Sequence, residues 1–160
     1  LPIVSSFVSD AQAAPGRFNL FNYRNATLIA DYGHNPDAIQ ALVSAINNIP
    51  SKKRSVVISA AGDRRDEDIR QQTRILGDAF DEIVLYQDKC QRGRADGEVL
   101  ALLREGLGSA KRTQKVSEVV GEDIAIEVAL SNLEDGELCL ILVDQVEQSL
   151  GQINNRIALG

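Results

Sequence analysis

Short apolar runs rich in Val and Ile alternate along the chain with longer segments in which apolar residues recur every three or four positions. The first pattern is typical of buried strands, and the second is typical of amphipathic helices. The predicted strands are residues 18–23, 27–30, 55–61, 83–86, 111–116 and 138–143, of which 111–116 has the weakest pattern. The predicted helices are residues 36–49, 67–80, 99–107, 122–133 and 145–157. This order predicts an α/β fold whose mostly parallel sheet has helices on both faces.

Local signals refine this prediction at two places. Only a short Arg24-Asn25 turn separates the first two strands, so we expect a hairpin with an antiparallel strand at the sheet edge. The helix over 36–49 has a capping residue in Asn35 and a proline at its start in Pro36. The apolar spacing also assigns the buried faces of two later helices, Ile69, Ile75, Leu76 and Phe80 in the first and Ile124, Val128 and Leu133 in the second.

Polar loops follow the predicted parallel strands at residues 31–36, 62–66 and 88–94, and Asp144 follows the last strand. In open parallel sheets, ligands bind outside the carboxyl ends of the strands. Because these loops share that edge, we expect the binding site there.

The loop at 31–36 combines a strand-end acid, Asp31, with His34, Asn35 and a helix start. A carboxylate in this position can accept hydrogen bonds from ribose hydroxyls, and the N–H groups of a helix start favour an anion. The alternative is an ordinary strand-to-helix turn with His34 on the surface.

Arginines stand in three further loops. Arg17 follows a Pro-Gly turn, Arg64 and Arg65 precede a helix, and Arg92 and Arg94 flank a glycine. A guanidinium offers a fork of donors to phosphate or carboxylate. The alternatives are a surface arginine at position 17, a helix start neutralised by its own acids at 62–68, and a solvated loop at 92–94.

Composition narrows the class of protein. The 160 residues are 44% hydrophobic and 25% charged, which suits one globular domain, and the formal net charge is -6. An acidic balance argues against general binding to nucleic acid or anionic membranes. The two cysteines have no metal-ligand spacing, and Cys139 lies in an apolar run where burial is expected, so the pattern indicates a reducing, cytoplasmic setting.

Several catalytic patterns are absent from the sequence. It has neither a G-x-x-x-x-G-K-[ST] phosphate loop nor a G-x-G-x-x-G fingerprint, and His34 is its single histidine. No residue is assigned a catalytic role, and we expect no ATP activation by this chain alone. The chain has no Met and opens on Leu1-Pro2-Ile3, which indicates a segment of a longer protein with residues 1–14 as a linker or tail of a preceding domain.

Taken together, these loops resemble a known family. Pro15-Gly16-Arg17, a hairpin and then Asp-Tyr-Gly-His-Asn-Pro-Asp-Ala at 31–38 resemble the start of the C-terminal domain of Mur ligases and folylpolyglutamate synthases. Gly-Asp-Arg-Arg-Asp-Glu-Asp-Ile-Arg at 62–70 looks like the cyanophycin synthetase branch of that family, although Gly33 stands where that branch usually has Ala. The resemblance runs from about residue 7 to 153.

The resemblance implies a Rossmann-like domain that closes over a separate central domain holding the phosphate loop and magnesium. ATP would activate a carboxylate, and an incoming amine would attack it. In the cyanophycin branch, arginine would be joined to the β-carboxyl of an aspartate.

By position, the resemblance assigns Arg17, Asp31, His34 and Asn35 to ATP. It assigns Arg64 to the carboxylate of the incoming amino acid and places Arg92, Asp144 and Glu147 in the same pocket. Acidic groups there would suit the guanidinium of an arginine substrate.

Two alternatives remain open on the sequence. The first is a domain of a peptidoglycan Mur ligase or a folylpolyglutamate-type ligase, with a different amino acid. The second is a nucleotide-binding or scaffolding domain without catalysis.

Overall fold

The structure, a computed structural model, describes residues 18–33, 35–60, 65–87 and 97–159. Its six strands form one sheet in the order β1-β2-β6-β3-β4-β5. The strands are β1 (Asn19–Tyr23), β2 (Ala26–Asp31), β3 (Arg54–Ile58), β4 (Glu82–Gln87), β5 (Lys115–Val120) and β6 (Leu138–Leu142). The α-helices are α2 (Pro36–Ile46), α3 (Asp66–Gly77), α4 (Glu98–Gly106), α5 (Glu122–Asn132) and α6 (Val146–Leu159). A short 3-10 turn, η1 (Leu107–Ser109), follows α4.

The edge hairpin predicted from the Arg24-Asn25 turn is confirmed. Strand β1 pairs antiparallel with β2, and every other pairing in the sheet is parallel. Arg24 and Asn25 have φ values of 52° and 61°, the left-handed conformation that a two-residue turn between twisted strands requires.

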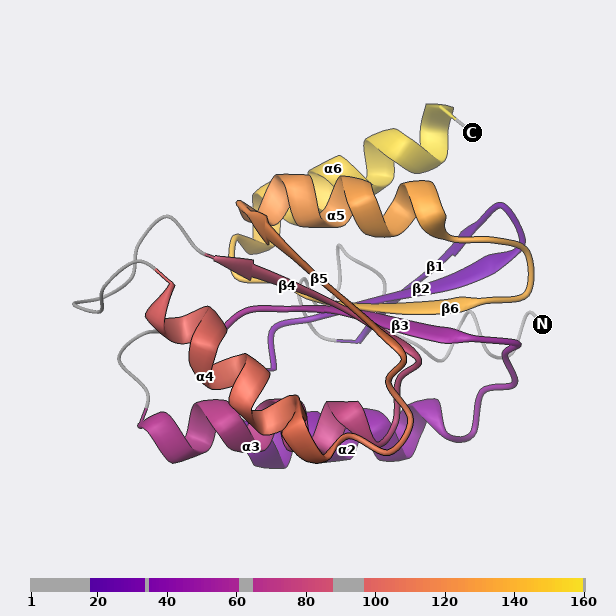
Figure 1. Ribbon diagram of the computed structural model, residues 1–160. Coiled ribbons are helices and arrows are strands. Elements are labelled where there is room, and N and C mark those ends of the chain that lie inside the picture. The colour runs from indigo at the N-terminus through magenta and orange to yellow at the C-terminus, as the bar shows by residue number, and fades with distance from the viewer. Residues whose placement is uncertain (1–17, 34, 61–64, 88–96, 160) are drawn as a thin grey trace.

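Helices cover both faces of the sheet, as expected. Figure 1 shows α2, α3 and α4 on one face and α5 and α6 on the other. Side chains of a strand alternate between these layers: Val56 and Ile58 pack into the core under α2–α4, and Val57 packs into the core under α5 and α6. The sheet is therefore buried on both sides, which explains why β6 is an unbroken apolar run, Leu138–Leu142.

The strand predicted at 111–116 is shifted, because β5 runs from Lys115 to Val120. The segment before it bonds to the turn after α3 instead of to a neighbouring strand. The backbone N–H groups of Arg112 and Thr113 donate to the carbonyl of Gly77, and the Thr113 hydroxyl donates to the carbonyl of Phe80 at 2.7 Å.

The predicted buried face of α5 is wrong for Ile124, which is 49% exposed. The buried positions of this helix are Glu122, Ala125, Ile126, Ala129 and Leu130. Helical spacing from the buried Glu122 leads to 125, 126 and 129, so the acid fixes which side of the helix faces the sheet. Leu133, at the end of the helix, is buried as predicted.

Two helix ends also differ from the prediction. Helix α3 ends at Gly77, so the buried Phe80 belongs to the turn that follows, with its N–H donating to the carbonyl of Leu76. Helix α2 ends at Ile46 and continues as a turn through Ile49. Among the described helices, none combines the length and apolar character needed to cross a membrane.

Candidate functional site

The sheet has a switch point at β6. Its neighbours β2 and β3 are followed by helices on one face, whereas β6 itself is followed by α6 on the other face. Strands whose connections leave in opposite directions open a crevice at their carboxyl ends, where open α/β sheets bind ligands. We call this side of the sheet the C-terminal edge. The residues that reach it next to β6 are Asp31, at the end of β2, and Asp144, just beyond β6.

Asp31 is tied into the fold through both of its carboxylate oxygens. Oδ2 accepts the N–H of Phe18 at 2.8 Å, and Oδ1 accepts the N–H of Gly33 at 2.7 Å. Phe18 has a φ of 46°, a conformation that a bulky residue rarely adopts, and the bond to Asp31 holds it there. Among the described residues each carboxylate oxygen accepts one N–H, and a carboxylate oxygen can accept two, so a structural role and a ligand role are compatible.

Gly33 permits the close approach to Asp31. A Cβ built at this position would lie 3.2 Å from Oδ1 of Asp31 and 3.2 Å from Cδ1 of Leu42. These distances are tighter than ordinary contact, so an alanine requires its neighbours to move by a few tenths of an ångström. Close packing thus favours a glycine in the Tyr-Gly-His sequence.

Asn35 caps α2 as predicted. Its side-chain oxygen accepts the N–H of Ala38 at 2.8 Å, and its backbone is extended, with φ -133° and ψ 160°. This bond uses the oxygen of the exposed Asn35 side chain as an acceptor.

Arg65 is paired with an acid of its own helix. Its Nε and Nη2 donate to the two carboxylate oxygens of Asp68 at 3.1 and 3.0 Å. This arrangement fits the alternative in which the loop at 62–68 is neutralised by its own acids. Arg64, the residue assigned to the substrate carboxylate, lies outside the described residues.

Asp144 and Asp31 are held side by side through the backbone, because the N–H of Val143 donates to the carbonyl of Asp31 at 2.9 Å. The carboxylate of Asp144 accepts the side-chain amide of Gln145 at 3.3 Å. Glu147 is exposed in the first turn of α6. The fold therefore places Asp31, Asp144 and Glu147 at one edge, as expected for residues that follow parallel strands.

Glu122 is the residue at this edge that the sequence reasoning missed. It is only 8% exposed. Oε2 accepts the N–H of Asp144 and Oε1 accepts the N–H of Gln145, both at 3.0 Å, and the Ser149 hydroxyl also donates to Oε2. A carboxylate from α5 thus satisfies N–H groups at the start of α6 and fixes the backbone of Asp144.

Tyr86 supports the same segment from the middle of the sheet. Its hydroxyl donates to the carbonyl of Leu142 at 3.2 Å, although β4 and β6 are separated by β3.

The signal for Glu122 in the sequence was a Gly-Glu pair after a strand, with small and apolar residues at 125, 126 and 129.

Comparison with known proteins identifies the family. Residues 16–142 match the model of the Mur ligase glutamate ligase domain. The chain belongs to this family. Mur ligase C-terminal domains are parts of ATP-dependent ligases, and the match includes every strand of the described sheet.

Curated relatives of this Mur ligase domain include cyanophycin synthetases. The chain is 34% identical to the enzyme of Crocosphaera subtropica over 96% of its length and 33% identical to that of Geminocystis herdmanii over 94%. It spans 17% of the length of each of these relatives. It is also 24% identical, over 88% of its length, to a UDP-N-acetylmuramoyl-L-alanyl-D-glutamate--2,6-diaminopimelate ligase of Geobacillus kaustophilus.

Solved structures have the same fold. A UDP-N-acetylmuramoyl-L-alanyl-D-glutamate--2,6-diaminopimelate ligase superposes with a TM-score of 0.75 at 19% identity, covering 92% of this chain and 32% of that one. E. coli FolC in complex with DHPP and ADP gives a TM-score of 0.70 at 23% identity, covering 91% of this chain and 33% of that one. The Rossmann-like fold expected for the Mur ligase domain is thereby confirmed.

Four candidate residues of the Mur ligase domain, Arg17, His34, Arg64 and Arg92, lie outside the described residues. Within the described residues, no group of three or more His, Cys, Asp or Glu side chains is arranged to hold a metal ion. The described part of the C-terminal edge therefore presents the carboxylates of Asp31, Asp144 and Glu147.

Proposed function

We propose that the chain is the ATP- and amino-acid-binding C-terminal domain of an ATP-dependent amide ligase of the cyanophycin synthetase type. The observation that carries this proposal is the 34% identity to such an enzyme across 96% of the chain. In the full enzyme, arginine would be joined to the β-carboxyl of an aspartate. The remainder of the machinery, including a phosphate loop and magnesium, would belong to a central domain of the same parent protein.

In this proposal the nucleotide lies against the end of β2 and the start of α2. Asp31 accepts the ribose hydroxyls with the lone pairs that Phe18 and Gly33 leave open. Arg17 supplies positive charge to the phosphates, and His34 and Asn35 line the nucleotide. The described residues fit a ribose because a half-buried carboxylate stands at the switch point of the sheet.

The incoming amino acid lies nearer β6 and β3. Arg64 and Arg92 hold its carboxylate, and Asp144 or Glu147 holds a guanidinium at its other end. The domain then orients the amine for attack on a carboxyl group activated by ATP, with phosphate leaving as the amide forms. Binding both substrates on one rigid sheet edge keeps the reacting groups close together.

The proposal is tested with the full-length parent protein, Mg-ATP, arginine and an aspartate-containing acceptor. We expect amide formation with stoichiometric ADP release, and we expect the 160-residue chain alone to give neither. Amide formation by the isolated chain contradicts the proposal, and so does a parent protein that does not use arginine as a substrate.

A peptidoglycan-type ligase is the second candidate, favoured by the 24% identity to the Geobacillus kaustophilus enzyme. In that case 2,6-diaminopimelate replaces arginine as the amine that stimulates ADP release. If the chain is a nucleotide-binding or scaffolding domain without catalysis, neither amine stimulates ADP release.

A further inference from the structure

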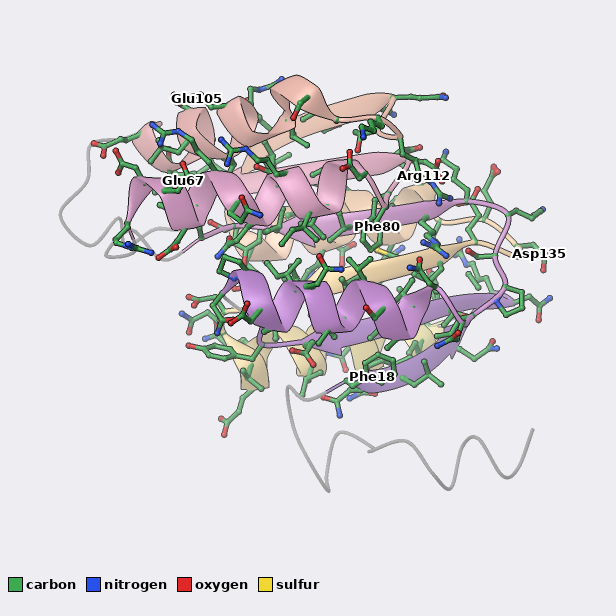
Figure 2. All side chains as sticks on the ribbon, turned by 90° about the horizontal axis from the view of Figure 1, so that it is seen from below. Phe18, Glu67, Phe80, Glu105, Arg112 and Asp135 are labelled. Carbon is green, nitrogen blue, oxygen red and sulfur yellow. The ribbon has the colours of Figure 1, made fainter. Side chains whose placement is uncertain are left out.

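Two cavities lie at the opposite edge of the sheet, where the parallel strands begin, and they meet at Arg112. The first, of about 320 Å³, lies between α2 and α3. The second, of about 570 Å³, lies beside the starts of β3, β4 and β5. Figure 2 shows Arg112 and Asp135 at one end of the molecule and Glu67 and Glu105, near the C-terminal edge, at the other.

The lining of these cavities is basic although the chain has a formal net charge of -6. The six cationic residues of the lining are Lys52, Lys53, Arg54, Arg74, Arg112 and Lys115. The three acidic ones are Asp78, Asp81 and Glu82. The lining of the two cavities thus contains more cationic than acidic residues, although acids such as Asp135 lie at the same end of the molecule.

Arg54, on the floor of the first cavity, is half-buried, and its guanidinium is hydrogen-bonded to neutral oxygens. Nη1 donates to Oδ1 of Asn47 at 2.8 Å and to the carbonyl of Ala79 at 3.4 Å. Burial, and then the neighbouring Arg112, lower the pKa of Arg54, while Asp81 opposes the shift. An arginine stays protonated under such a shift, so the cavity contains a partly buried cation that has no hydrogen-bonded acid among the described residues.

Asp81 is the acid next to both arginines, and Arg112 bonds to both of its carboxylate oxygens. Nε and Nη2 of Arg112 donate to its two oxygens at 2.9 and 3.2 Å, and the backbone N–H of Arg54 donates to Oδ2 at 2.9 Å. This carboxylate therefore bonds to one guanidinium, that of Arg112, while the guanidinium of Arg54 feels only its charge. Their remaining N–H donors, at the wall of the first cavity, are suited to a second anion.

We propose that the first cavity binds a small oxyanion, a carboxylate or a phosphate group, between Arg54 and Arg112. Arg74 and the amides of Gln40, Asn47 and Gln71 complete a polar lining around it. The cavity has the volume of a small-molecule site, and the bound anion would neutralise the excess charge. This site lies across the sheet from the C-terminal edge and does not depend on the ligase proposal.

The test is titration of the 160-residue chain with inorganic phosphate and, separately, with succinate, followed by calorimetry and by amide NMR shifts. We expect saturable binding of at least one anion, with shifts grouped at Arg54, Asn47 and Arg112. The anion with the lower dissociation constant decides between phosphate and carboxylate chemistry. Arg54→Gln is expected to weaken that binding about tenfold or more, because charge-assisted hydrogen bonds are lost.

Matched variants separate a built site from a general charge effect. Arg104→Gln removes the same charge from the exposed Arg104–Glu118 pair, outside both cavities, and should leave binding unchanged. Arg74→Gln alters an exposed side of the cavity, where Arg74 is ion-paired with Glu67 at 2.6 Å, and should weaken binding severalfold, which covers the case of an unstable Arg54 variant. Equal weakening in Arg104→Gln and the cavity variants, or absence of saturable binding, overturns the proposal.

Discussion

The carboxylate of Glu122 accepts the backbone N–H of Asp144 at 3.0 Å and joins the start of α5 to the start of α6. Replacing this acid by glutamine keeps the shape of the side chain but turns one acceptor into a donor that faces N–H groups. We expect Glu122→Gln to lower the free energy of unfolding by about 1–3 kcal/mol. Urea denaturation of the 160-residue chain measures the effect.

The exposed neighbour Asp123 supplies the control, since Asp123→Asn removes the same charge from the same helix turn. We expect a change within about 0.5 kcal/mol for this variant. Equal losses in both variants would mean that the charge at the helix start, and not the bonds to Asp144 and Gln145, is the stabilising factor.

A second prediction concerns the substrate pocket proposed at Asp144 and Glu147. In the full-length enzyme, Asp144→Asn or Glu147→Gln should lower kcat/KM for arginine by about tenfold or more. The value for citrulline should fall far less, because citrulline has no charged guanidinium. Arg64→Ala should lower kcat/KM for both amino acids alike. The measurement is kcat/KM for each amino acid, and an unchanged ratio of arginine to citrulline in both acidic variants places the guanidinium elsewhere.

Gly106 sets the distance between α3 and α4. A Cβ at this position would overlap the carbonyl oxygen of Arg70 and the hydroxyl oxygen of Thr73. The Thr73 hydroxyl also donates to the carbonyl of Leu103 at 2.6 Å across the same contact. Gly106→Ala is therefore expected to destabilise the chain by about 1–3 kcal/mol.

Gly151, in the middle of α6, is the matched control, because a Cβ there meets nothing within 4 Å. Gly151→Ala should stabilise the chain by about 0.5–1 kcal/mol through helix propensity. Thermal unfolding of the two variants compares them directly, and a stabilising Gly106→Ala would show that the helices separate without cost.

Asp81 should make stability depend on pH in the acidic range. Burial raises its pKa, but the hydrogen bonds from Arg112 and from the N–H of Arg54 outweigh that effect and hold the pKa of Asp81 below its ordinary value. A group whose pKa is depressed on folding stabilises the protein above its unfolded pKa, about 4, and that contribution is lost as the pH falls towards the folded pKa.

Asp81→Asn is expected to destabilise the chain at pH 7 by about 1–3 kcal/mol and to make unfolding less dependent on pH below about 4. Asp135→Asn, in an exposed turn, should do neither. Urea midpoints measured from pH 2.5 to 7 test both variants, and parallel pH profiles of wild type and Asp81→Asn would contradict the assignment.

Cys139 should be chemically inert in the folded chain. Burial in β6 raises the pKa of its thiol to about 12, so the reactive thiolate is essentially absent at neutral pH. In a Cys90→Ser variant, labelling with a thiol reagent at pH 8 should require unfolding and should accelerate sharply in urea. Rapid labelling without denaturant would place Cys139 outside the core.

Much of the fold was determined by the sequence itself. The hairpin follows from the short Arg24-Asn25 turn, in which Asn25 tolerates positive φ. The start of α2 follows from Asn35 and Pro36, and β6 follows from its apolar run. These are local signals, because each depends on the conformation or burial of a few consecutive residues. The gathering of Asp31 and Asp144 at one edge was also predictable, since all parallel strands end on the same side of a sheet.

The tertiary structure alone decided the roles that depend on partners distant in the chain. Glu122 belongs to α5 in sequence but satisfies the start of α6, and this long-range bond turns Ile124 towards solvent against the local apolar spacing. The backbone of Arg112 and Thr113 bonds to the carbonyl of Gly77 at the end of α3, so β5 begins only at Lys115. Buried polar groups must form hydrogen bonds, and their partners can lie far away in the sequence. The spacing of residues along the chain does not show which distant group will be the partner.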